Sequence, residues 1–245
     1  RYASRGLGDV YKRQILFVLS SMLICVVLFF VIIKLKCCNS YEKPILIRIE
    51  GNIGSGKSTL LNLIQSTNNN IVCIQEPIKK WEPYLTNIHK YTGMGNEFLM
   101  QLMVLDHFAD TATHIENYRS KCIIIERSMH TMIQVFSYLL FESGILSIFQ
   151  YNYLKAKAAD YRIHYDHCFF IYTPYDVCWK RVQSRGRICE TNVSMEYLRE
   201  LEETHCKLMA KILDEQYTNV HIIDGTAPTE EVFQDVSNAL LTIMG

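Results

Sequence analysis

The stretch from Ile45 to Leu61, ILIRIEGNIGSGKSTLL, decides the fold that this sequence predicts. Its apolar start is typical of a buried strand in a parallel sheet. The segment Gly51 to Ser58 then matches the pattern G-x-x-x-x-G-K-[ST], and leucines at helical spacing follow it. Such a loop joins a strand to a helix and turns backbone N–H groups onto phosphate oxygens. The sequence therefore predicts a nucleoside triphosphate site at this loop.

The residues of the loop differ in what they offer a triphosphate. The glycines remove Cβ atoms that would block the approach of phosphate oxygens. Lys57 can reach the β- and γ-phosphates, and Ser58 can ligate Mg²⁺. ATP and Mg²⁺ are therefore the expected cofactors. The expected ATP-binding residues of the loop are Gly51, Asn52, Ile53, Gly54, Ser55, Gly56, Lys57, Ser58 and Thr59.

Length and charge narrow the class of protein. The 245 residues are enough for one α/β domain with a sizeable core and an N-terminal addition. The 25 basic and 25 acidic side chains cancel, so the sequence gives no electrostatic footprint for nucleic acid, and no nucleic-acid partner is expected. The nine cysteines contain no C-x-x-C pair, which indicates a reducing compartment. We expect a cytoplasmic protein, with a mitochondrial location as the alternative.

The N-terminal 38 residues need a separate interpretation. Residues 1–14 are predicted to be non-native, because the segment Asp9 to Gln14 is what a transposase adapter of sequencing libraries encodes. Residues 15–33 carry no charge and are long enough to cross a bilayer. Three interpretations of residues 15–38 are open: a membrane anchor, a targeting segment whose start is lost, or translated untranslated sequence. A membrane is an expected partner only if residues 15–33 are genuine, and the lysines after them would then keep the next domain in the cytosol.

Beyond the phosphate loop, short apolar segments alternate with helix-periodic ones. This alternation predicts a doubly wound, five-stranded parallel sheet with flanking helices. The expected strands are residues 45–49, 71–75, 121–125, 167–172 and 220–224. The expected helices after the loop are residues 97–118, 129–141, 145–161, a helix after Pro174, 194–216 and 230–244, whereas residues 82–83 are expected to continue an irregular stretch.

Charged side chains follow two of the expected strands. Glu76 comes after the second strand, and the pair Glu126-Arg127 comes after the third. Because ligands bind beyond the carboxyl ends of parallel strands, these groups are expected at the same edge as the phosphate loop. A carboxylate such as Glu76 can take the proton from an attacking hydroxyl there. Trp81 can wall a flat base, and Gln101 is an amide that can read a base edge.

Three arginines surround a glycine after Pro174. Arg181, Arg185 and Arg187 are costly to hold together without an anion, and Arg is suited to bidentate phosphate contact. We interpret this segment as an Arg-rich lid that closes over ATP. A solvated basic turn is the alternative.

In this order and spacing, EGNIGSGKST, EPIKKW, Gln101, ERS and R-x-x-x-R-G-R-x-x-E resemble the deoxynucleoside kinase family. The resemblance covers Pro44 to the C-terminus and implies a P-loop kinase domain over residues 44–245. It implies transfer of the ATP γ-phosphate to the 5′-hydroxyl of a deoxynucleoside, in nucleotide salvage. It also implies a homodimer formed through helices beside the sheet.

The resemblance implies roles for individual residues. The catalytic residues would be Glu76 as the base, Arg127 at the 5′-hydroxyl and transferring phosphate, and Lys57. Ser58 and Glu126 would place Mg²⁺. A tyrosine would meet the 3′-hydroxyl with Glu190, and Tyr91 is preferred for it over Tyr84. The substrate-binding residues implied are Glu76, Trp81, Tyr91, Gln101, Phe108, Arg127, Met132, Phe136 and Glu190.

The sequence also predicts which base the substrate carries and leaves some alternative functions open. Phe108 and Met132 stand where the deoxycytidine kinase branch of the family has a charged pair, which predicts pyrimidines over purines. Thymidine and deoxycytidine both stay open. The alternative functions are a thymidylate kinase that acts on a monophosphate, a catalytically silent accessory protein of kinase shape, and a membrane-tethered scaffold.

Overall fold

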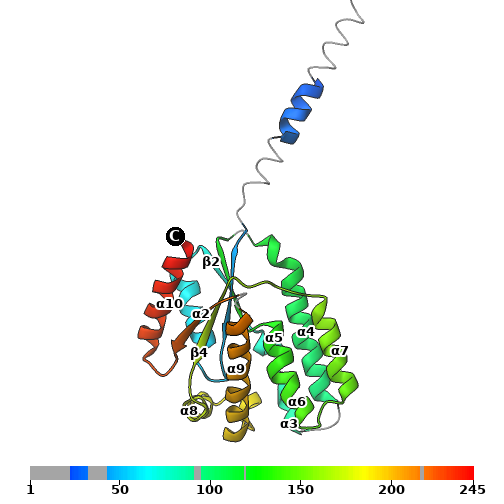
Figure 1. Ribbon diagram of the computed structural model, residues 1–245, viewed down its shortest axis with the longest axis vertical. Coiled ribbons are helices and arrows are strands. Elements are labelled where there is room, and N and C mark those ends of the chain that lie inside the picture. The colour runs from blue at the N-terminus through cyan, green and yellow to red at the C-terminus, as the bar shows by residue number, and fades with distance from the viewer. Residues whose placement is uncertain (1–22, 33–42, 91–94, 119, 216–217) are drawn as a thin grey trace, which may run out of the picture. The chain divides into compact units, whose positions relative to one another are not determined.

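The computed structural model describes residues 23–32, 43–90, 95–118, 120–215 and 218–245 (Figure 1). The chain divides into two compact units, residues 1–43 and 44–245. Residues 23–32 form a helix with exposed apolar side chains. Within the described ranges, no helix is long and apolar enough to cross a membrane. Residues 1–14 and the rest of the segment 15–38 lie outside the described residues, so the interpretations of both stay predictions.

The second unit is built on a five-stranded sheet whose strands are all parallel, as the sequence predicts. The strands are β1 (Ile45–Glu50), β2 (Ile71–Ile74), β3 (Cys122–Glu126), β4 (His167–Tyr172) and β5 (Asn219–Asp224). Their order is β2-β3-β1-β4-β5. The phosphate loop therefore leaves the central strand, between the carboxyl ends of β3 and β4.

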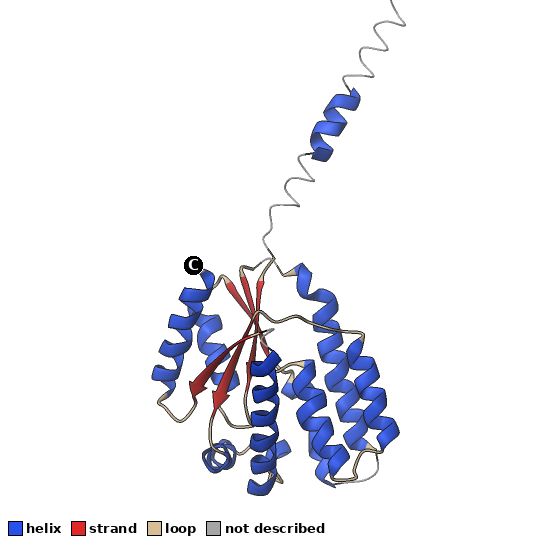
Figure 2. Cartoon of the chain, viewed as in Figure 1, coloured by secondary structure: helices blue, strands red, loops and turns tan. Residues whose placement is uncertain are grey.

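Helices cover both faces of the sheet (Figures 1 and 2). The helices are α2 (Lys57–Thr67), α3 (Ile78–Lys90), α4 (Asn96–His114), α5 (Met129–Thr131), α6 (Tyr138–Glu142), α7 (Ile148–Ala159), α8 (Tyr175–Arg185), α9 (Met195–Glu215) and α10 (Thr229–Met244). Two short 3₁₀ turns, η1 (Ile115–Asn117) and η3 (Ile188–Glu190), and one π-helical turn, η2 (Met132–Ser137), complete the elements.

Alternating residues of β1 explain the two layers. Ile47 and Ile49 are fully buried against apolar residues of α2 and α10. Leu46 lies on the opposite face, in a core that α4 and α7 complete. A third core, between β4, α8 and α9, lies beside it. The sequence of a strand that is buried on both faces is almost continuously apolar, and β1 has this pattern.

The expectation of an irregular stretch at residues 82–83 is wrong, because Pro83 lies inside α3. This helix begins just after Pro77, whose carbonyl accepts hydrogen bonds from the backbone N–H groups of Lys80 and Trp81. Pro83 is in the second turn, where a proline removes one main-chain hydrogen bond. The buried Trp81 side chain supplies packing that holds the turn.

The helix expected over residues 129–141 is interrupted in the structure. Ser128 caps α5 by accepting a hydrogen bond from the Thr131 backbone N–H at 3.3 Å, and the chain then enters the π-helical turn η2 before α6. Such turns insert one extra residue and are frequent at functional sites. The apolar period of the sequence does not reveal this turn. The next helix, α7, begins at Ile148 rather than at residue 145, because Ser147 and Gln150 form a capping box.

Candidate active site

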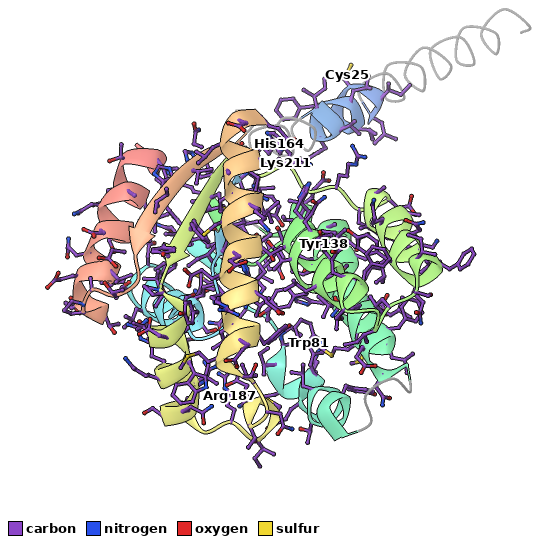
Figure 3. The ribbon with its side chains drawn as sticks, turned by 60° about the horizontal axis from the view of Figure 1, so that its bottom comes forward. Cys25, Trp81, Tyr138, His164, Arg187 and Lys211 are labelled. Carbon is purple, nitrogen blue, oxygen red and sulfur yellow. The ribbon has the colours of Figure 1, made fainter. Side chains whose placement is uncertain are left out.

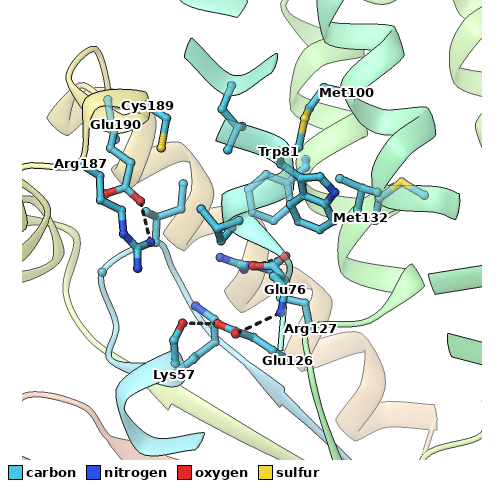
Figure 4. Close-up of a pocket in the computed structure, with 18 of the residues that line it drawn as sticks. Lys57, Glu76, Trp81, Met100, Glu126, Arg127, Met132, Arg187, Cys189 and Glu190 are labelled. Atoms are coloured by element: carbon cyan, nitrogen blue, oxygen red, sulfur yellow. Dashed lines mark hydrogen bonds and ion pairs between the residues drawn. The ribbon is translucent and has the colours of Figure 1, made fainter. Parts of the chain in front are cut away.

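A cavity of about 520 Å³ lies beside the phosphate loop, at the carboxyl edge of β1, β2 and β3 (Figure 4). Side chains from the loop, α3, α4, η2, η3 and α9 line it. Trp81 and Arg187, from distant parts of the sequence, lie at the same end of the unit (Figure 3). The predicted site residues that line the cavity are Ile53, Gly54, Gly56, Lys57, Ser58, Thr59, Glu76, Trp81, Gln101, Phe108, Glu126, Arg127, Met132, Phe136, Arg185, Arg187 and Glu190.

The phosphate loop is tightly packed and requires its first glycine. Gly51 has a φ of 144°, and a Cβ there would lie 2.5 Å from the Ile171 carbonyl oxygen. Asn52 and Ser55 of the loop are buried and do not line the large cavity. The Asn52 amide instead donates to the Leu198 carbonyl at 2.8 Å, which ties the loop to α9.

Lys57 is buried under the loop and is held by neutral oxygens. Its Nζ donates to the carbonyls of Gly51 at 3.0 Å and Asn52 at 2.8 Å. Burial first, and then the positive charge of Arg127, lower the pKa of Lys57 to about 8. An ammonium without a carboxylate partner at bonding distance is suited to an incoming phosphate, whose charge would stabilise the protonated form.

Ser58 and Glu126 meet at the base of the cavity. The Ser58 Oγ donates to Glu126 Oε1 at 2.7 Å, and Glu126 Oε2 lies 3.4 Å from the Glu76 backbone N–H. Hydroxyl and carboxylate oxygens are the hard donors that Mg²⁺ prefers. No group of three or more His, Cys, Asp or Glu side chains suited to a metal occurs in the described part of the chain.

Glu76 and Arg127 form a largely buried ion pair in the site. The Arg127 Nε lies 3.1 Å from each carboxylate oxygen of Glu76, and both side chains are largely buried. Burial is the main cause that raises the pKa of Glu76, although the Arg127 charge opposes it. Arg127 also has a φ of 64°, which is uncommon for a residue with a Cβ. Strain of this kind clusters at functional sites.

The far end of the cavity is largely apolar. Trp81, Phe108 and Met132 are buried there, and Gln101 projects from α4. The Gln101 carboxamide oxygen accepts a hydrogen bond of 3.0 Å from Ser137, which the π-helical turn places beneath it. Phe136 lies between this end and the charged groups, with the Arg127 guanidinium 4.8 Å above its ring.

The arginine-rich segment is split between two cavities. Arg185 donates to Glu190 from Nε at 3.0 Å and from Nη2 at 2.6 Å, and Arg187 Nη1 lies 3.4 Å from the same carboxylate. Arg181 does not line the large cavity. It lines a second cavity of about 280 Å³ with the loop, the start of α10 and Arg185. Glu190 is therefore ion-paired with the lid arginines in this structure.

Of the two tyrosines proposed for the sugar, Tyr84 lies outside the cavity, and the position of Tyr91 is not described. Tyr84 is 46% exposed. Tyr197 of α9 does line it, and burial raises the pKa of its hydroxyl to about 12. Sequence reasoning also missed Glu97, Ser137 and the buried His205. No local pattern marks these residues, because they reach the site only through packing of α4, η2 and α9.

The chain is similar to several known proteins. The family model described as deoxynucleoside kinase matches residues 47–244. A protein of Invertebrate iridescent virus 6 that is named as a kinase is 30% identical over 200 residues, 80% of this chain and 96% of that protein. A protein of Fowlpox virus (strain NVSL) named as a probable deoxycytidine kinase is 29% identical, over 74% of this chain and 78% of its own. The mitochondrial thymidine kinase 2 of Homo sapiens is 26% identical, over 69% and 66%.

A solved structure confirms the fold. Deoxyadenosine kinase from M. mycoides, determined with dCMP and a flexible dCDP bound, superposes with a TM-score of 0.72 over 81% of this chain and 100% of that one. The two sequences are 19% identical, so this likeness concerns the fold. The predicted P-loop kinase architecture is confirmed.

Proposed function

Because this chain belongs to the deoxynucleoside kinase family, we propose that it transfers the γ-phosphate of ATP to the 5′-hydroxyl of a pyrimidine deoxynucleoside. Family membership makes the chain a kinase of nucleosides, so the thymidylate kinase and the catalytically silent alternatives are not favoured. The pyrimidine preference and a role in nucleotide salvage are the finer parts of the proposal. The buried Glu76–Arg127 pair beside Lys57 is the observation that carries it.

The acceptor end of the reaction is assigned to Glu76 and Arg127. The 5′-hydroxyl proton would pass to a Glu76 oxygen while the hydroxyl oxygen attacks the γ-phosphorus and the bond to the β-phosphate oxygen breaks. A pKa raised by burial brings Glu76 closer to the pH at which a base works best. Arg127 and Lys57 would offset the charge that develops on the phosphate oxygens.

Ser58 and Glu126 are the residues that would hold Mg²⁺. Their oxygens already lie 2.7 Å apart beside the phosphate loop, and Lys57 occupies the other side of that loop. When bound, the ion would neutralise β- and γ-phosphate oxygens. Glu126 Oε2 also lies 3.4 Å from the Glu76 backbone nitrogen, which would keep the carboxylate at this position.

The two cavities suggest how two substrates share the loop. Gly54, Gly56 and Thr59 line both of them. A triphosphate on the loop would therefore direct its nucleoside into the smaller cavity beside Arg181 and its γ-phosphate toward the larger one. The larger cavity would take the acceptor deoxynucleoside.

The proposed pyrimidine preference depends on the apolar end of the larger cavity. Phe108 and Met132 offer no polar group to the amino and carbonyl atoms of a purine. Burying such an atom without a partner costs about 1–3 kcal/mol. Gln101 can pair with either pyrimidine, because its carboxamide offers both a donor and an acceptor.

We also propose a homodimer through the outer face of α4 and α7. These helices pack side by side (Figure 1). Phe98 of α4 contacts Tyr153 of α7 edge to face. The face carries exposed apolar side chains, of which Phe149 is 84% exposed, and Leu99 and Ile148 about half exposed. An exposed apolar patch of this kind marks an interaction surface. Light scattering of the wild type and of Phe149→Asp would test this; a wild-type monomer would contradict it.

The proposed location is the cytoplasm, with residues 44–245 as the working domain and residues 1–14 as non-native sequence. A chain that starts at Asn39 should then be as active as the longer one, because every site residue lies after it. Loss of activity on this truncation, with the longer chain active, would show that the N-terminal unit takes part in the enzyme.

One coupled ADP-release assay tests the substrate assignment. The wild type is offered ATP with thymidine, deoxycytidine, deoxyadenosine, deoxyguanosine or dTMP, and kcat/KM is ranked. We expect both pyrimidine nucleosides above both purines. A purine at the top would contradict the roles of Phe108 and Met132, and turnover of dTMP alone would replace the proposal with a thymidylate kinase.

A further inference from the structure

A histidine that the proposed mechanism does not use lies directly behind Arg127. His205 projects from the middle of α9 and is 1% exposed. Its Nδ1 lies 2.7 Å from the Leu201 carbonyl oxygen, one turn earlier in the helix, and its Nε2 lies 3.5 Å from Arg127 Nη1. A carbonyl can only accept, so Nδ1 carries the proton and Nε2 presents its lone pair to the guanidinium.

The surroundings keep this imidazole neutral. Burial, and then the Arg127 charge, lower the pKa of His205 to about 3. The Phe136 ring stands at 87° to the imidazole with its centroid 6.0 Å away, and it also lies under Arg127. Nothing in these contacts supplies a carboxylate at bonding distance of the ring. A protonated His205 would put a second positive charge against Arg127, whereas the neutral ring offers an acceptor.

The guanidinium is fixed on two of its three nitrogens. Nε is bound by Glu76, and Nη1 carries two hydrogens for two acceptors, the Gly51 carbonyl at 2.9 Å and His205. Among the described residues, Nη2 has no recorded protein partner. Nη2 is therefore the nitrogen available to a substrate oxygen in the cavity that Arg127 lines.

We propose that His205 is a positioning residue that, through its Nε2 acceptor, holds Arg127 with Nη2 directed at the acceptor hydroxyl and the transferring phosphate. The proposal rests on the proposed function of Arg127. Its consequence is that the hydrogen-bond acceptor, and not the bulk of the ring, matters at position 205. Alignment at a reacting centre is sensitive to small displacements, so the effect should be on kcat.

Two substitutions separate the acceptor from the bulk. His205→Gln can place a carboxamide oxygen where Nε2 lies, whereas His205→Leu fills similar space without an acceptor. We expect kcat of the Gln variant to stay within about 3-fold of wild type, and kcat of the Leu variant to fall about 10- to 100-fold with the nucleoside KM nearly unchanged. Thr204→Val is the matched control, because Thr204 is buried on the same helix and bonds only the Glu200 carbonyl.

A second measurement does not depend on turnover. Long-range ¹H–¹⁵N NMR of the imidazoles in the full wild-type chain reports the tautomer and charge of His205. We expect the neutral Nδ1–H form from pH 5 to pH 8. An Nε2–H tautomer, titration near pH 6.5, or equal kcat for the Gln and Leu variants would overturn the proposal. If the wild type phosphorylates no nucleoside while the NMR result holds, the proposed function fails and the contact stands.

Discussion

The acceptor side of the site and the lid hold their charged groups in opposite ways. On the acceptor side, Lys57, Glu126 and Arg127 are buried and bonded to the sheet and the loop. In the lid, the side chains of Arg185 and Arg187 are about one-third exposed and bond to Glu190 of the same segment. The charged groups of the first region therefore contact the protein core, whereas those of the second lie partly in solvent.

This difference indicates which ion pairs of the protein a phosphate could replace. The lid ion pairs join partly exposed arginines to Glu190, whose side chain is 13% exposed, so we expect a phosphate to replace Glu190 at a lower cost than breaking a pair that is buried on both sides. Leaving a buried charge without its partner destabilises the folded protein strongly. We therefore expect the charged groups of the acceptor side to keep their contacts. We therefore expect substitutions on the acceptor side to remove turnover, and substitutions in the lid to weaken ATP binding.

The largest effect is expected from Lys57→Ala. Removal of the ammonium should lower kcat at least about 1,000-fold, the order expected when compensation of phosphoryl charge is lost. The measurement is steady-state phosphorylation of the best nucleoside. Lys57→Met is the matched control, because it removes the ammonium but keeps the bulk of the buried side-chain stem. Residual activity within 10-fold of wild type would contradict the assignment.

The second largest effect on turnover is expected from Glu76→Gln. Loss of a general base predicts a fall in kcat of about two to four orders of magnitude, with nucleoside binding largely retained. Calorimetric titration of the nucleoside and pre-steady-state phosphorylation separate the two quantities. The pH profile adds a check: the pKa of Glu76 is raised, so wild-type kcat should fall as the pH drops through that value, and this limb should vanish in the variant. A kcat near wild type would show that another group takes the proton.

A smaller effect is expected in the lid. Arg185→Ala should raise the KM for ATP about 10-fold, equivalent to about 1.4 kcal/mol, and change kcat little. Lys180→Ala is the matched control, since Lys180 lies on the same helix and pairs with Asp176 in solvent. If Arg185→Ala instead lowered kcat as much as Glu76→Gln, the lid would belong to the chemistry, and the contrast between the regions would fail.

The last effect concerns stability rather than turnover. The pKa of His205 is lowered to about 3 from 6.5, so the unfolded chain binds a proton that the folded one does not. Stability from this group is present above pH 6.5 and is lost as the pH falls toward 3. Between pH 7 and pH 5 the loss should be about 2 kcal/mol, and His205→Gln should lack this component. Urea unfolding at the two pH values measures it; equal pH dependence in both proteins would contradict the lowered pKa.

The sequence determined the parts of this protein that depend on local order. The phosphate loop, five apolar strands and the helices between them follow from spacing and periodicity, and the sheet confirms their arrangement. Glu76, Glu126 and Arg127 were expected at one edge because parallel strands end together. The structure brings them within bonding distance there.

Only the tertiary structure decided what depends on packing between distant segments. Trp81 and its neighbours keep Pro83 within a helix, and the π-helical turn brings Ser137 under Gln101. Arg181 lines the smaller cavity and Arg187 the larger one, because α8 and the turn after it present their side chains to different cavities. His205 meets Arg127 across 78 residues of sequence, a contact that no local pattern encodes because it exists only when α9 packs against the end of β3.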